Sequence, residues 1–207
     1  MRGSNQKRQI KTKNEKKRLL LICEGSRTEP LYFYDLWQDK RNRKVVVEIP
    51  KCKDTEPIKL VKFADKYFSN KKYCYDEIYI IFDKDEHTSY SEAISISLKK
   101  DKTLKNDFNE LVDFIAIPSN PCFELWLLLH YRDIFVIIDR KQIFDYLKNY
   151  IPDYSKSMCK IYKITRNNLP IACNRATKMN NTSNPNSNKK CYSGVVNLVN
   201  RLLELAE

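Results

Sequence analysis

Glycine and histidine are scarce in this chain of 207 residues, which has three glycines and two histidines. So few glycines exclude a collagen-like or glycine-rich low-complexity protein. The turn after the first apolar segment is Glu24-Gly25-Ser26 rather than G-x-G-x-x-G, which argues against a dinucleotide-dependent dehydrogenase. The seven cysteines include no C-x-x-C pair, so neither a disulfide framework nor a zinc ribbon is expected.

Long apolar segments are also missing. The apolar runs at residues 19–23 and 134–138 are much shorter than the roughly 20 residues that a membrane helix needs. The first run follows a basic segment, but no small-residue cleavage site of a secretory signal comes after it. Reduced cysteines then favour a cytoplasmic protein that does not bind membranes.

Basic residues outnumber acidic ones, with 38 Lys and Arg against 26 Asp and Glu and a formal net charge of +12. The excess lies in two stretches. Residues 1–18 have eight bases and one acid, and residues 155–191 have eight bases and no acid. The rest of the chain is slightly acidic, so a polyanion would meet these stretches first. For residues 1–18, a merely solvated tail is the alternative.

Short apolar segments alternate with amphipathic ones as far as residue 117. Apolar runs bounded by polar residues are typical of strands buried on both faces of a parallel sheet. The alternation predicts an α/β fold, in which a parallel sheet is flanked by helices and joined by right-handed crossovers. The predicted strands are residues 19–23, 45–49, 78–82 and 114–117.

The chain changes character after the fourth predicted strand. Helices are predicted at residues 123–131, 141–150 and 194–207. A polar, asparagine-rich segment at residues 180–190 is predicted to be a mobile loop. The predicted organisation is a basic tail at residues 1–18, an α/β core at 19–131 and a mainly helical extension packed on the core at 132–207.

Three carboxylates directly follow buried strands. Glu24 comes after the first strand, and Asp83 and Asp85 come after the third. Ligands of an open parallel sheet bind beyond the carboxyl ends of its strands. If the first and third strands are neighbours, these acids meet there, and carboxylates are ligands of Mg²⁺ or Mn²⁺. Ordinary turn and capping acids are the alternative.

Three blocks of the sequence resemble the RloB family. They are LLICEG-x-x-TEP at residues 20–30, FDKD-x-H at 82–87 and SNPCFELWLLLH at 119–130, of which the third is the most specific. The resemblance extends from about residue 19 to the C-terminal helix. RloB proteins are similar to Toprim-domain nucleases, whose pattern has a Glu after the first strand and a D-x-D after the third.

The resemblance implies a Toprim-like sheet and a metal-dependent nuclease, a hydrolase of bacterial restriction and abortive phage-defence loci with a partner ATPase. Its catalytic and metal-binding residues would be Glu24, Asp83 and Asp85, with Glu24 suited to proton transfer. DNA and RNA substrates are not distinguished, because no motif for either is present. A non-catalytic subunit that binds a nucleotide or a protein in the same crevice is the alternative. The oligomeric state is not indicated.

Glu124 is the fourth predicted catalytic and metal-binding residue, since it begins a predicted helix and hard cations prefer oxygen ligands. A buried carboxylate that is hydrogen-bonded to a local donor is the alternative. His130 and Cys122 are expected to be packing residues. His87 either binds a phosphate or assists a proton transfer, or it is an ordinary loop histidine.

The basic stretch at residues 155–191 is predicted to bind nucleic acid through its phosphates. Tyr154, Tyr162 and Tyr192 are candidates for stacking on bases. The predicted nucleic-acid-binding residues are Lys156, Lys160, Lys163, Arg166, Arg175 and Lys178.

Overall fold

The structure is a computed structural model that describes residues 16–207, so most of the predicted basic tail lies outside the described residues. The strands are β1 (Lys17–Cys23), β2 (Val45–Glu48), β3 (Glu77–Asp83), β4 (Asp113–Asn120) and β5 (Tyr192–Ser193). The helices are α1 (Thr28–Lys40), α2 (Pro57–Asn70), α3 (Tyr90–Lys100), α4 (Glu124–Leu129), α5 (Arg140–Lys148), α6 (Ile161–Thr165), η1 (Arg166–Asn168, a 3₁₀ turn), α7 (Leu169–Asn180) and α8 (Val195–Glu204). No helix within residues 16–207 is long and apolar enough to cross a membrane.

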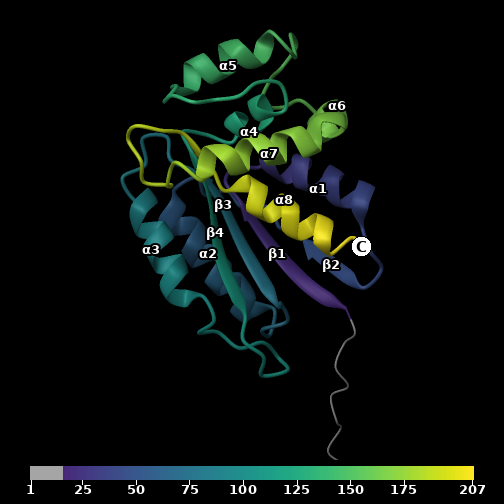
Figure 1. Ribbon diagram of the computed structural model, residues 1–207. Helices are drawn as coiled ribbons and strands as arrows, with labels where there is room; N and C mark the ends of the chain where they lie inside the picture. The colour runs from purple at the N-terminus through teal and green to yellow at the C-terminus, as the bar shows by residue number, and fades with distance from the viewer. Residues whose placement is uncertain (1–15) are drawn as a thin grey trace, which may run out of the picture.

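The strands form one sheet in the order β2-β1-β3-β4-β5, with the first four parallel and β5 antiparallel to β4 (Figure 1). The chain runs outward from β1 to β2, and then returns past β1 to β3 and β4. The crossover helices therefore lie on opposite faces, with α1 on one and α2 and α3 on the other. The predicted α/β class, with a helical C-terminal part, is confirmed. The order reverses between β1 and β3, where such sheets bind ligands.

The buried strands supply two cores, because their side chains point to alternate faces of the sheet. Leu19 and Leu21 of β1 pack with α1 and the helices α4 to α8, whereas Leu20 and Ile22 pack with α2 and α3. Every residue of β3 is buried. Burial on both faces explains why these strands are unbroken apolar runs in the sequence.

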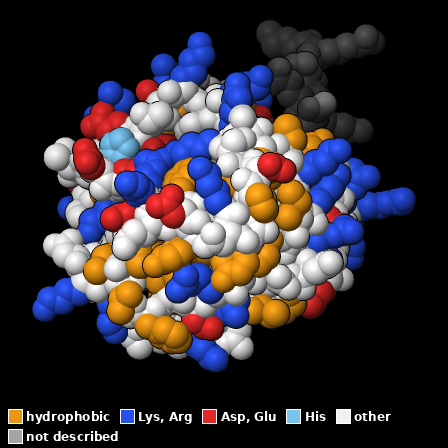
Figure 2. Space-filling model, turned by 90° about the horizontal axis from the view of Figure 1, so that it is seen from above, with side chains coloured by type: hydrophobic (Ala, Val, Ile, Leu, Met, Phe, Trp, Pro, Cys, Tyr) orange, Lys and Arg blue, Asp and Glu red, His pale blue; other side chains and the backbone are white. Residues whose placement is uncertain are grey.

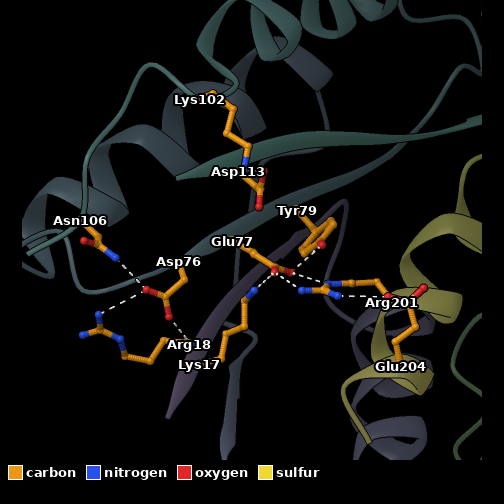
Figure 3. A network of polar contacts seen from close by, with 10 residues as sticks. All are labelled: Lys17, Arg18, Asp76, Glu77, Tyr79, Lys102, Asn106, Asp113, Arg201 and Glu204. Atoms are coloured by element: carbon orange, nitrogen blue, oxygen red, sulfur yellow. Dashed lines mark hydrogen bonds and ion pairs between the residues drawn. The ribbon is translucent and has the colours of Figure 1, made fainter. Parts of the chain in front are cut away.

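A charged network lies at the amino end of β3, where Figure 3 shows it joining distant segments. The buried carboxylate of Glu77 accepts hydrogen bonds from Arg201 of α8 at 2.7 and 3.2 Å, and Lys17 lies 2.6 Å away. Burial raises the pKa of Glu77, but hydrogen bonds from Arg201, Lys17 and Tyr79 outweigh it and hold the pKa below its usual value. The network thus fastens the last helix to the sheet.

The strand predicted at residues 114–117 extends further, to Asn120, because Pro118 and Ser119 still pair with β3 and β5 adds partners for Ser119 and Asn120. The backbone N–H of Gly194 donates a 2.8 Å hydrogen bond to the carbonyl of Pro118. A Cβ atom on Gly194 would lie 2.9 Å from that oxygen, so the close approach requires glycine. The helix predicted at residues 123–131 is shorter, as α4.

Candidate active site

Glu24 and Asp83 meet at the carboxyl edge of the sheet, because β1 and β3 are parallel neighbours. Oε2 of Glu24 accepts a 2.9 Å hydrogen bond from the backbone N–H of Asp83. The prediction that these acids meet depended on the first and third strands being neighbours, and they are. Figure 2, which views this end from above, shows acidic side chains interspersed with Lys and Arg.

Asp83 is one of two carboxylates of the cluster that are buried, with Glu124. It is buried at the end of β3, and its Oδ1 atom has no hydrogen-bond partner within the described residues. Burial raises the pKa of Asp83 well above its usual value, and the charges of Glu29, Glu24 and Glu124 raise it further. An ionised Asp83 is therefore costly in the free protein and would be stabilised by a cation.

Asp85 leaves the strand on a turn with a left-handed backbone, at φ +33°. Its N–H donates a 3.1 Å hydrogen bond to the carbonyl of Pro121, and the N–H of Lys84 donates a 2.8 Å bond to that of Ser119. The carboxylate of Asp85 forms an ion pair with Arg140, the first residue of α5. The structure therefore turns Asp85 toward α5.

Glu124 is buried at the start of α4. Its Oε1 accepts a 3.1 Å hydrogen bond from the hydroxyl of Tyr154, and its Oε2 has no partner among the described residues. Glu124 is near enough to Asp83 and Glu29 for its charge to raise the pKa of both. Glu124 is therefore hydrogen-bonded to a local donor through one oxygen, and its other oxygen is available to a metal ion.

Glu29 is a fifth carboxylate of the cluster, beyond the four predicted from the sequence. It lies in the first turn of α1. Burial, with the charges of Glu124 and Glu24, raises the pKa of Glu29 to about 8. The signal was available, since Glu29 belongs to the first RloB-like block, five residues after Glu24. Its position in a helix start suggested only a first-turn acid.

His87 lies beside Glu24 and is partly exposed. Its Nε2 is 3.5 Å from Oε1 of Glu24. Burial raises the pKa of Glu24, while the Asp83 N–H and His87 lower it and the Asp85 charge raises it. His87 is therefore placed beside the carboxylate for which proton transfer was predicted.

His130 and Cys122 are core residues in the structure, as expected from the sequence. Both are buried. Nδ1 of His130 lies 3.0 Å from the carbonyl oxygen of Trp126, in the preceding turn of the helix. Burial lowers the pKa of His130 to about 4, so the ring is neutral at pH 7. It supplies no cation to the site.

The asparagine-rich loop at residues 181–190 packs against the turn after β3. The ammonium group of Lys84 donates to the carbonyl of Ser187 at 3.1 Å and to Oδ1 of Asn188 at 2.8 Å. The amide of Asn120 donates to the carbonyls of Ser187 and Pro185 at 2.7 and 3.2 Å. These contacts join the second and third RloB-like blocks to the C-terminal part of the chain.

The two arginines among the predicted nucleic-acid-binding residues already have acidic partners. Arg166 lies 3.3 Å from Asp39. Arg175 lies 3.2 Å from Asp133 and donates a 3.1 Å hydrogen bond to the carbonyl of Leu129 at the end of α4. Their role in the fold therefore competes with any role in binding.

The lysines of the same set are more accessible. Lys156 is exposed, and its charge lies near enough to Asp85 and Glu29 to lower the pKa of each. The structure thus brings Lys156 to the acidic cluster. The other exposed lysines of the predicted set are Lys160, Lys163 and Lys178.

The predicted stacking role is wrong for Tyr154 and Tyr162, because both rings are buried. Their hydroxyls donate instead to the carboxylates of Glu124 and Asp39, the latter at 2.9 Å. Tyr192 is half-buried in β5. None of these three tyrosines therefore has a fully exposed ring on which a base could stack.

The donor chemistry of the cluster fits a hard divalent cation. The unpartnered buried oxygens of Asp83 and Glu124 are of the kind that Mg²⁺ prefers. As they stand, the Asp, Glu, His and Cys side chains of residues 16–207 form no group of three or more placed to hold a metal ion. The carboxylate of Asp85 is paired with Arg140 instead.

A family model described as RloB-like protein matches residues 19–202 of the chain. The match includes every residue of the carboxylate cluster and all three sequence blocks. Searches of curated proteins and of solved structures give no match.

Proposed function

This chain belongs to the RloB-like family, and from that premise we propose that it is a magnesium-dependent nuclease of anti-phage defence. It would hydrolyse phosphodiester bonds of DNA or RNA in the cytoplasm, together with a partner ATPase. The observation that carries the proposal is that Glu24 and Asp83 meet where the strand order reverses, with Glu124 and Asp85 near enough for their charges to raise the pKa of Asp83. Carboxylates held this close to one another cost stability, and such clusters are typical of functional sites.

Each residue has a distinct part in this proposal. Asp83 and Glu124 would hold the cation through oxygens that have no other partner in the described structure, and Glu24 and Asp85 would complete the site. A bound Mg²⁺ supplies Lewis acidity toward the scissile phosphate and lowers the pKa of the attacking water. Glu24, with His87 beside it, can accept or release a proton there.

Asp83→Asn tests the proposal, because it removes a charge and almost no volume. The measurements are cleavage of mixed DNA and RNA with Mg²⁺ or Mn²⁺, and melting with and without the metal. We expect the wild-type protein to cleave and to melt at a higher temperature with metal, and the variant to lose both effects. Glu92→Gln, an exposed acid on α3, is the matched control and should keep both.

Full cleavage by a folded Asp83→Asn, Asp85→Asn double variant would contradict the nuclease proposal. The assay is repeated with the product of an adjacent ATPase gene, since the family resemblance implies such a partner. Metal-free melting of the double variant at or above the wild-type temperature is the control for folding, because repulsion among the carboxylates is relieved.

The second candidate is a non-catalytic subunit that binds a nucleotide or a partner protein in the crevice. It is favoured by one observation, that Arg140 and Tyr154 already engage Asp85 and Glu124. Nucleotide binding that survives Asp83→Asn, with no cleavage by the wild-type protein with or without the ATPase, would support this candidate over the nuclease.

A further inference from the structure

A pocket of about 560 Å³ opens beside the carboxylate cluster. It lies between the turn that follows β3 and the start of α5. Its lining residues are Asp85, Glu86, His87, Pro121, Asp139 and Arg140. Because Asp85 and His87 belong to both the pocket and the cluster, a molecule in the pocket is adjacent to the site of the proposed chemistry.

Arg140 is held in this pocket by the start of its helix. Asp139 caps α5, with its side chain accepting the N–H of Gln142 at 2.8 Å and its own N–H donating to Gln142 Oε1 at 2.9 Å. This reciprocal cap fixes the backbone from which Arg140 projects. The guanidinium also lies 5.9 Å from the ring centroid of Phe144, one turn along α5. The neighbouring residues Asp139, Gln142 and Phe144 therefore hold Arg140 in position.

The guanidinium has donors to spare. It offers five N–H groups in a planar fork, and the contact with Asp85 uses Nη1. No other side chain or carbonyl of residues 16–207 is bonded to it, and 38% of the side chain is exposed. A fork of this kind matches two oxygens of a phosphate, which a lysine cannot do.

The charges around the pocket leave room for an anion. Lys156 and His87 lie on the cluster side, and Lys156 lowers the pKa of Asp85 through space. Of the two other acids that line the pocket, Asp139 is engaged in the helix cap and Glu86 is exposed to solvent. Arg140 is therefore the permanent cation that an entering phosphate meets.

We propose that this pocket is a phosphate subsite in which Arg140 binds a non-scissile phosphate of the nucleic-acid strand, next to the phosphate held at the carboxylates. The inference rests on the proposed nuclease function for the identity of the strand. Arg140 has a second effect through Asp85, which it orients by the ion pair. A strand phosphate that binds the remaining N–H donors would fix the position of the strand relative to the carboxylates.

The test measures binding without chemistry. A short labelled single strand is titrated in EDTA at several salt concentrations, with fluorescence anisotropy as the readout. Arg140→Gln should weaken binding by about tenfold, the loss expected for a charged hydrogen bond. It should also reduce the log–log salt slope by about 0.7, the loss of one phosphate contact on a single strand. Lys141→Gln, the exposed neighbour on α5, removes the same charge and should change neither value appreciably.

Arg140→Lys separates charge from geometry, since it keeps the charge without the fork. We expect it to recover the salt slope but only part of the affinity. If Arg140→Gln is poorly folded, the comparison is made with Arg140→Lys, whose folding is checked by its melting temperature. Equal affinities and slopes for Arg140→Gln and Lys141→Gln would overturn the subsite.

Separate results distinguish free phosphate from strand phosphate as the ligand, and failure of the subsite from failure of the nuclease proposal. Inorganic phosphate that competes with the strand in the wild-type protein, but not in Arg140→Gln, supports the subsite. Arg140-dependent binding of phosphate without Arg140-dependent binding of the strand would overturn its assignment to nucleic acid. Arg140-dependent strand binding by a protein that never cleaves would leave the subsite standing and refute the nuclease.

Discussion

The hydroxyl of Tyr154 donates a 3.1 Å hydrogen bond to Oε1 of Glu124, thirty residues earlier in the chain. The bond joins the segment after α5 to the first turn of α4. It fixes one oxygen of a buried carboxylate, while the other oxygen is buried without a partner among the described residues. Glu124 is thus oriented by the same part of the chain that supplies Arg140 to Asp85.

Tyr154→Phe should lower the metal-free free energy of unfolding by about 1–3 kcal/mol, because it leaves a buried carboxylate without its donor. Glu124→Gln should leave that free energy unchanged or higher, because the amide oxygen keeps the Tyr154 bond and the like-charge repulsion is relieved. Urea unfolding of the two variants and the double variant measures both effects and their coupling. A Tyr154→Phe protein as stable as the wild type would show that this bond contributes nothing.

Glu29 should make the protein less stable at alkaline pH. Its pKa is about 8 in the folded protein and about 4.3 when unfolded, so the folded state binds the extra proton between these values. Stability is therefore full below the unfolded pKa and is lost as the pH rises through 8. Glu29→Gln should match the wild type near pH 4.5 and exceed it at pH 9 by on the order of 1–2 kcal/mol, after allowance for solvent screening. A difference that does not change with pH would contradict this prediction.

His130 should act in the opposite direction, at acid pH. Its pKa is about 4 in the folded protein and about 6.5 when unfolded, so the unfolded state takes up a proton first. Stability is therefore present above pH 6.5 and is lost as the pH falls toward 4, by on the order of 2–3 kcal/mol. In His130→Asn the amide can keep the bond to Trp126, and this part of the pH dependence should disappear. Its survival in the variant would assign it to another group.

The basic residues of the C-terminal part should separate into two classes. Each of Lys160→Gln and Lys163→Gln should reduce the log–log salt slope of nucleic-acid binding by ~0.7 to 0.9 if it contacts a phosphate. Arg175→Gln should instead lower stability by about 1–2 kcal/mol with little change in slope, because its guanidinium binds Asp133 and the end of α4. Salt titrations and melting of the same three proteins test this division. A reduced slope for Arg175→Gln alone would reverse it.

The sequence was sufficient to predict the four parallel strands, though not β5, and to place Glu24 and Asp83 at the ends of two of them. Strands β1 and β3 are continuous apolar runs because they are buried on both faces, and Glu24 and Asp83 directly follow them. Parallel pairing of these strands then brings the acids together without further information. Local patterns therefore sufficed wherever the contact depended on the strand order alone.

Contacts made by the C-terminal part could not be predicted in this way. The ion pair of Arg140 with Asp85 and the bond of Tyr154 to Glu124 depend on how helices α4 and α5 pack, which amphipathic periodicity does not specify. Glu29 was missed because its neighbourhood, not its residue type, raises its pKa. The asparagine-rich loop has the composition of a free loop, yet Asn120 binds it through backbone carbonyls that any sequence possesses.

The pairing of β5 with β4 has a consequence for the order in which the protein is made. Ser119 pairs with Asp83 of β3 on one side, but its partner on the other side, Ser193, and the partner of Asn120, Tyr192, come more than seventy positions later in the chain. A ribosome releases the chain from the N-terminus, so Glu24, Asp83, Asp85 and Glu124 are synthesised before Arg140 and Tyr154, which bind two of them, and before β5. The nascent chain thus holds an incomplete acidic centre until its final helices emerge, and chains that stop early should not contain a finished one.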